Sequence, residues 1–287
     1  MNTNQNQVRK IFSYVLFPFI VGTNISLLIV SITQGWDLGS SFTYMLLGNI
    51  VGMFFLEKIW FFKKEWNTNL AELIRDFGYF GFNGLLDAAV KFGIGYLVIT
   101  YASPTQLMPL WVSAILAILV VEFFGYWYHR IGHVNHFLWK IHSIHHVPDK
   151  VNLLNNNTAN FLNIVFGTAI KLLPLTLLGF CKEAVFIATS LTTIHSYVVH
   201  VNADIKGGWL NAIFMSPEHH RMHHSTVIQE AKNFAVLLTF WDKIFGTYVY
   251  QKGMVPKEVG VQNPENYPKP FEVVKGFLFP FTSKRLW

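Results

Sequence analysis

Twelve histidines dominate the chemistry available to this 287-residue chain, and all of them lie between His129 and His224. Nine of the twelve are spaced as three helical clusters and one separate position. They are His129 and His133, then His142, His145 and His146, then His200, and finally His220, His223 and His224. Residues three or four apart share one face of an α-helix, so each cluster can direct its imidazoles at one point.

This number of imidazoles predicts a pair of metal ions. Neutral imidazole binds Zn, Cu, Fe and Ni, and one ion takes about four to six ligands. Structural zinc sites close at four ligands and usually include cysteine, whereas this chain has only Cys181. Redox iron with open positions fits better, because iron binds dioxygen and zinc does not. The chain also lacks the HExxH motif of zinc metalloproteases.

Three further residues are candidates for contacts to the metals or to their ligands. Bound histidines usually donate their second ring N–H to a carboxylate or carbonyl, and Glu122 lies two helical turns before His129. His195 lies five residues before His200 and becomes an additional ligand only if its helix bulges. Asn202 either orients a ligand or a bound water, or ends a helix. Weaker candidates, expected to be solvated, are Asp204, Glu218 and Asp242.

The composition predicts a membrane protein. Hydrophobic residues make up 52% of the chain and charged residues 13%, whereas soluble domains carry about 25% charged residues. Aromatic residues reach 16%, and they suit lipid contact and interfacial belts. The net charge of +6 is attributed to cytoplasmic loops beside anionic lipid rather than to a nucleic-acid-binding surface. The single cysteine excludes an intramolecular disulfide.

Apolar runs predict an all-α fold, a multi-pass transmembrane helical bundle. Four runs are long enough to cross a bilayer, namely residues 11–33, 42–60, 77–101 and 110–128. Lys and Arg residues lie near residues 9–10, 58–75 and 130–150, and the turns 34–41 and 102–109 have none. The positive-inside rule therefore places both termini and a His-rich helical cap in the cytoplasm. Two further runs, 161–180 and 183–201, are expected to form a membrane hairpin that returns His200 to the other clusters.

Taken in order, the histidine motifs resemble the fatty acid hydroxylase superfamily, which includes the sterol desaturases and alkylglycerol monooxygenases. The matching stretches are Tyr126-Trp-Tyr-His-Arg-Ile-Gly-His133, Leu138-Trp-Lys-Ile-His-Ser-Ile-His-His146, His200-Val-Asn202, Ser216-Pro-Glu-His-His-Arg-Met-His-His-Ser225 and Trp241-Asp-Lys-Ile-Phe-Gly-Thr-Tyr248. The chain departs from the pattern at Asn233-Phe234-Ala235, where many members have Asn-Tyr-Gly. The resemblance covers about residues 75–248 and implies a di-iron catalytic region over 111–250. The apolar runs and the composition predict N-terminal transmembrane helices over 1–110 and a cytoplasmic tail over 251–287.

The resemblance also implies an activity. It implies a membrane oxidoreductase with two Fe ions held by the nine histidines, with no other catalytic residue. Dioxygen would be the co-substrate, and a sterol, fatty acyl, alkylglycerol or carotenoid lipid would be hydroxylated or desaturated. Electrons would come from a separate donor of the cytochrome b5, ferredoxin or reductase type. Two alternatives stay open: a zinc-dependent membrane hydrolase, and a non-catalytic protein that binds metal or lipid.

Overall fold

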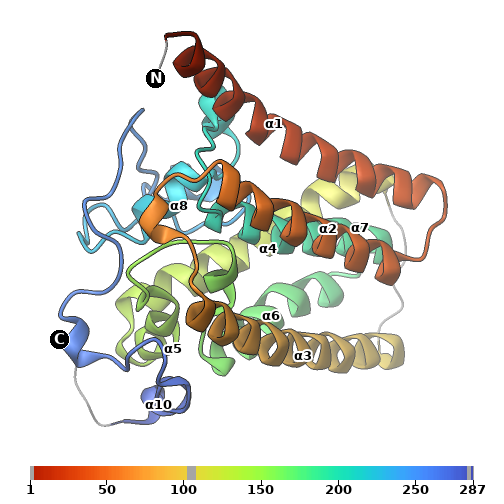
Figure 1. Ribbon diagram of the computed structural model, residues 1–287. Helices are drawn as coiled ribbons and strands as arrows, with labels where there is room; N and C mark the ends of the chain where they lie inside the picture. The colour runs from red at the N-terminus through yellow and green to blue at the C-terminus, as the bar shows by residue number, and fades with distance from the viewer. Residues whose placement is uncertain (1–2, 102–107, 283–285, 287) are drawn as a thin grey trace.

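The fold is a bundle of long helices that carries a more compact, histidine-bearing region at one end (Figure 1). The computed structural model describes residues 3–101, 108–282 and 286, and every regular element within these ranges is helical. The α-helices are α1 (Thr3–Thr33), α2 (Leu38–Ile59), α3 (Leu70–Tyr101), α4 (Leu110–Val134), α5 (His136–His146), α6 (Phe161–Leu177), α7 (Lys182–His200), α8 (Pro217–His223), α9 (Phe240–Ile244) and α10 (Val273–Leu278). Short 3-10 turns cover Lys64–Trp66, Leu154–Asn157, Gly208–Ala212, Pro264–Asn266 and Phe279–Phe281. The predicted all-helical class is confirmed.

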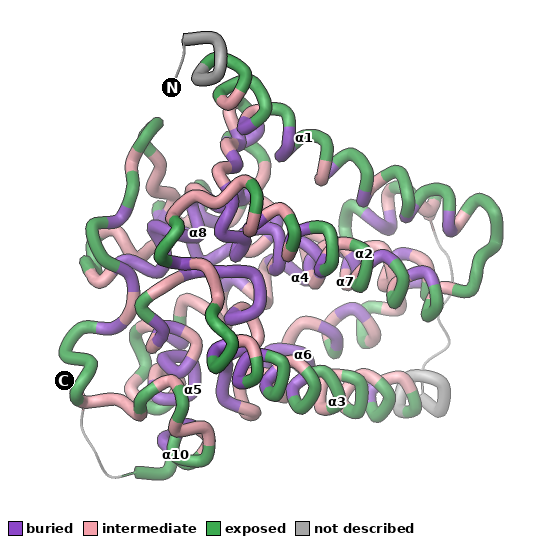
Figure 2. The backbone as a smooth tube through the Cα atoms, in the orientation of Figure 1, coloured by how far each residue is buried: buried purple, intermediate pink, exposed green. Residues whose placement is uncertain are grey.

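Three helices within the described residues are long and apolar enough to cross a membrane: Gln7–Thr33, Leu38–Ile59 and Leu110–Val134. Their outer faces carry large apolar side chains, such as Phe19, Phe55 and Trp111, which are each more than 60% exposed. Figure 2 shows these exposed faces along α1 and α2. Apolar surface of this extent is unfavourable in water, so these faces are suited to lipid contact.

The remaining predicted span, residues 77–101, lies within α3 and contains a charged pair. Lys91 Nζ lies 2.7 Å from Asp87 Oδ2, because residues four apart share one face of the helix. Asp87 Oδ1 also accepts a hydrogen bond of 2.6 Å from Thr168 Oγ1 on α6. The charged groups therefore bond to one another and join α3 to α6. The number of crossings stays a prediction.

The predicted hairpin corresponds to α6 and α7, which are joined by a short turn at residues 178–181. Gly179 has a φ of +73°, a left-handed conformation that glycine adopts at helix ends without a steric penalty. Both helices pack against α4, which also contacts α5. Small residues such as Ala117 and Ala188 allow the close approach of α4 to α7. This packing brings the end of α7, with His200, to the histidines of α4 and α5.

The C-terminal segment predicted to be a tail is packed onto the protein over its described residues. Asn160 Nδ2 donates hydrogen bonds to the carbonyls of Gly276 (2.9 Å) and Phe277 (3.0 Å) in α10. Trp139 Nε1 on α5 donates to Tyr267 Oη over 2.9 Å. These contacts place α10 beside α5, as Figure 1 shows. The segment therefore covers one side of the histidine-bearing region.

An amide pair links α1 to α2 and gives a test of the helix packing. Asn24 Nδ2 donates to Asn49 Oδ1 (3.0 Å), and Asn49 Nδ2 donates to Asn24 Oδ1 (2.7 Å). We expect Asn24→Leu to destabilise the protein by roughly 1 kcal/mol, because it leaves the Asn49 carbonyl without a donor in apolar surroundings. The double variant Asn24→Leu/Asn49→Leu should regain part of the loss, as measured by the unfolding temperature in detergent. A double variant less stable than the single one would contradict this account.

Candidate metal centre

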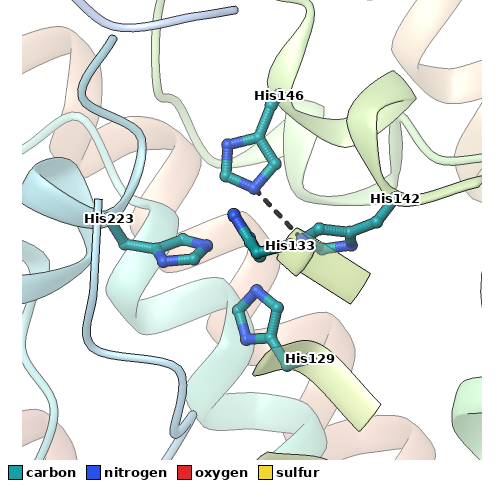
Figure 3. Close-up of side chains that lie close together, drawn as sticks. All are labelled: His129, His133, His142, His146 and His223. Atoms are coloured by element: carbon teal, nitrogen blue, oxygen red, sulfur yellow. Dashed lines mark hydrogen bonds between the residues drawn. The ribbon is translucent and has the colours of Figure 1, made fainter. Parts of the chain in front are cut away.

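All nine histidines predicted to be ligands lie in two neighbouring groups. The five-histidine group consists of His129 and His133 from α4, His142 and His146 from α5, and His223 from α8. The four-histidine group consists of His145 from α5, His200 from α7, His220 from α8, and His224 directly after α8. Within each group, one ring nitrogen per residue lies within 4.8 Å of the others. Figure 3 shows the imidazoles of the five-histidine group converging on a common centre.

Each histidine triplet is divided between the two groups, rather than directed at one point as the spacing suggested. Successive residues of an α-helix are about 100° apart, so His145 and His146 point in different directions. His146 joins the five-histidine group with His142, and His145 joins the other. In the third cluster, His223 joins the five-histidine group, and His220 and His224 join the four-histidine group. The groups touch where the rings of His146 and His224 stack, with centroids 4.3 Å apart.

Backbone carbonyls hold the outward-facing nitrogens of three histidines. Nδ1 of His129 lies 2.6 Å from Phe234 O, that of His223 lies 2.8 Å from Lys232 O, and that of His200 lies 3.1 Å from Asn152 O. A carbonyl only accepts, so each of these Nδ1 atoms carries the proton. The lone pair of each ring is therefore on Nε2, which faces the group.

The inward-facing nitrogens fit metal ligation. The Nε2 atoms of His129, His133 and His223 are buried and have no hydrogen-bond partner within the described part of the chain. In the other group, Nε2 of His145 lies 3.2 Å from Nε2 of His200. Buried lone pairs without a donor are unfavourable, and a cation at the centre of each group would satisfy them. The donor sets of both groups are therefore chemically suited to a metal ion.

The surroundings also favour the neutral form of the imidazoles, which is the form that binds metals. Burial, reinforced by neighbouring imidazoles, lowers the pKa of six of them well below the usual value of 6.5. These are His142, His145, His146, His220, His223 and His224. At neutral pH these rings therefore carry no charge.

The three other predicted site residues lie outside both groups. His195 Nε2 is 2.6 Å from Met215 O, because a residue five positions before His200 faces another direction on a regular helix. Glu122 Oε2 accepts the N–H groups of residues 237 and 238 (2.9 and 3.0 Å), so it holds the segment that follows Phe234. Asn202 bonds through its side chain to the N–H and the carbonyl of Lys63, and so attaches the loop after α2.

Asp242 and Glu57 have a larger part in the site than the sequence indicated. Asp242 was expected to be solvated but is fully buried, and its carboxyl accepts the N–H groups of Phe234 and Ala235. Burial raises its pKa above the usual value. Glu57 lies near the end of the predicted apolar run 42–60. It is fully buried too, and a charged residue within an apolar helix was the signal that could have identified it.

Asparagines complete the surroundings of the two groups. Asn155 Oδ1 lies 3.0 Å from His200 Nδ1, and Asn163 Oδ1 lies 3.4 Å from His142 Nδ1. Neither residue was predicted to touch the site. The only signal in the sequence is the density of asparagines between residues 152 and 163, which is also typical of turns.

Comparisons with known proteins identify related sequences. Residues 114–247 match the family model described as fatty acid hydroxylase. The ornithine lipid hydroxylase OlsE of Rhizobium tropici is 26% identical over 85% of this chain and 76% of its own length. The alkylglycerol monooxygenase of Homo sapiens is 32% identical over 59% of this chain, which spans only 37% of that protein. A very-long-chain aldehyde decarbonylase, GL1-7 of Oryza sativa subsp. japonica, is 29% identical over 58% of this chain and 27% of its own length. No solved structure matches.

The lowered pKa values predict a loss of stability in acid. The folded protein keeps the buried rings neutral, whereas the unfolded chain binds protons below about pH 6.5. Stability is therefore fully present above pH 6.5 and is lost as the pH falls below it. Between about pH 7.5 and 5.5 we expect a loss of roughly 1 kcal/mol for each affected histidine. The unfolding temperature of chelator-treated protein in detergent measures this loss, and a value that does not change with pH would refute the prediction.

Proposed function

Because this chain belongs to the fatty acid hydroxylase superfamily, we propose that it is a membrane-bound di-iron oxidoreductase that uses O2 to hydroxylate a lipid. One observation carries the proposal: nine histidines, all buried or half-buried, form two adjacent groups whose ring nitrogens converge on two centres. Desaturation is the other reaction of this class. The names of the hydroxylase and monooxygenase relatives favour hydroxylation.

Each group of imidazoles would hold one iron ion. The bound ions supply dioxygen activation and the removal of hydrogen from an unactivated C–H bond. The role of the protein is to fix the ligands and to exclude water. Phe234 and Trp139 help to exclude water, because the centroids of their rings lie 5.2 and 5.1 Å from that of His133. The backbone carbonyls that lie against His129, His200 and His223 fix the orientation of these ligands.

The position of the site supports a substrate that enters from the bilayer. The histidine groups lie at the end of the bundle opposite the α1–α2 turn (Figure 1). Basic residues gather at the same end: Arg9 pairs with Asp204 and Lys58 Nζ bonds to Thr68 O. By the positive-inside rule this end faces the cytoplasm. A cytochrome b5, ferredoxin or reductase would then deliver electrons there, and a lipid chain would reach the site along the apolar helices.

Replacement of one ligand tests the proposal. His145 belongs to the four-histidine group, so we expect His145→Ala to lower the iron content of the purified protein and to abolish turnover. Iron is measured by elemental analysis. Turnover is measured by mass spectrometry of membrane lipids under labelled O2, which adds one labelled oxygen to the product. His136→Asn is the control, because His136 lies outside both groups.

Two outcomes would contradict the assignment. Full turnover by His145→Ala would exclude this group from catalysis. Turnover that requires zinc and proceeds without oxygen would favour a zinc-dependent hydrolase instead.

A further inference from the structure

Two buried carboxyl groups lie behind the histidine groups in equivalent ways. We infer that Asp242 and Glu57 are positioning residues, each of which holds one metal-binding histidine through a peptide group that lies between them. The histidines are His129 in the five-histidine group and His200 in the four-histidine group. The inference rests on the proposed function, because it assumes that both groups bind metal ions.

Asp242 acts on the five-histidine group through the peptide between residues 234 and 235. The carbonyl of this peptide, Phe234 O, lies 2.6 Å from His129 Nδ1. The N–H of the same peptide, on Ala235, donates to Asp242 Oδ2 over 2.9 Å. The other carboxyl oxygen accepts from the Phe234 N–H (2.8 Å) and from Thr247 Oγ1 (2.7 Å). Both oxygens of Asp242 are therefore in use as acceptors.

Glu57 acts on the four-histidine group through the peptide between residues 152 and 153. The carbonyl of this peptide, Asn152 O, lies 3.1 Å from His200 Nδ1. The N–H of the same peptide, on Leu153, donates to Glu57 Oε1 over 2.6 Å. The same oxygen accepts the N–H of Asn202, two residues after His200, over 2.6 Å. Glu57 Oε2 has no hydrogen-bond partner among the residues that the structure describes.

The arrangement follows from the geometry of a peptide group. The N–H and the C=O of a trans peptide point in opposite directions, so a carboxyl on one side and an imidazole on the other are joined in a line. An acceptor on the N–H polarises the peptide and strengthens its carbonyl as an acceptor. The carbonyl in turn fixes the orientation and the tautomer of the imidazole, as carboxylates do directly in many metal sites.

Glu57 extends the site beyond the region that the family model matches. It belongs to α2, whereas the match covers residues 114–247. An N-terminal helix that otherwise faces lipid therefore holds the peptide behind one metal-binding histidine. Residues 114–247 alone would lack this support for the four-histidine group.

The use of the carboxyl oxygens predicts different results for the two amide substitutions. Glu57→Gln keeps an oxygen that accepts both N–H groups and places its NH2 where no partner exists, so it should bind two metal ions like the natural protein. Glu57→Ala should weaken binding at the four-histidine group by roughly 10- to 100-fold. Asp242→Asn and Asp242→Ala should both weaken the five-histidine group by a similar factor, because an NH2 in either position of Asn meets a donor.

Metal binding by the purified full chain in detergent tests these expectations. Co(II) is titrated into chelator-treated protein, and bound metal is counted by elemental analysis. The unfolding temperature of the metal-free protein shows whether each variant is folded. Asp87→Asn is the matched control, because this α3 carboxyl bonds to Lys91 and Thr168 and to neither histidine group. It should bind both ions with unchanged affinity.

Combined variants assign each loss to a group. Glu57→Ala in a His129→Ala background should weaken the binding of the remaining ion by the same factor, whereas in a His200→Ala background it should change nothing further. If Glu57→Ala does not fold, Glu57→Asp takes its place, since a side chain one methylene shorter cannot reach both N–H groups.

The outcomes separate the inference from the proposed function. Glu57→Ala and Asp242→Asn proteins that bind two ions with natural affinity, and lose only thermal stability, would overturn the inference and leave the proposed function intact. A natural protein that binds no metal would overturn both.

Discussion

The packing of nine buried or half-buried imidazoles side by side is the constraint to which the rest of the structure is adapted. A buried polar atom without a partner costs about 1–3 kcal/mol, and the Nε2 atoms of His129, His133 and His223 have none over residues 3–101 and 108–282. Their outward nitrogens do not relieve this cost, because carbonyls fix the tautomers of His129 and His223 with the lone pair inward. Without a cation, the interior would be a concentration of unfavourable lone pairs. With one in each group, the same atoms become ligands.

The imidazoles are brought together by helices that pack around α4. This helix passes from an apolar face that suits lipid to His129 and His133 at its other end. α5 and α7 pack against it, and α8 packs against α7, so four helices deliver imidazoles to one region. The C-terminal segment then covers α5, where Trp139 bonds to Tyr267. The proposed function, oxygen chemistry on a lipid chain, would require such a site beside lipid-facing helices.

Several features were predictable because they depend on local periodicity. Helical spacing identified the nine histidines that the structure gathers, and apolar runs located α1, α2 and α4. Other features were not predictable in this way. The carboxyl group of Asp242 indicated a solvated side chain, and only the packing of residues 233–248 against α4 makes it buried. Glu57 lies far from every histidine in the sequence, so no local pattern connects it to His200.

The sequence by itself determined the residue types of the site and the class of fold, since a helix repeats every 3.6 residues and imidazole has few other uses in such density. Tertiary structure decided which histidines share a group. His145 and His146 are neighbours in the chain yet belong to different groups, because a turn of about 100° separates them and a different helix faces each. It also decided which carbonyl lies behind each ring. These contacts join segments far apart in the chain, and their geometry exists only once the helices have packed.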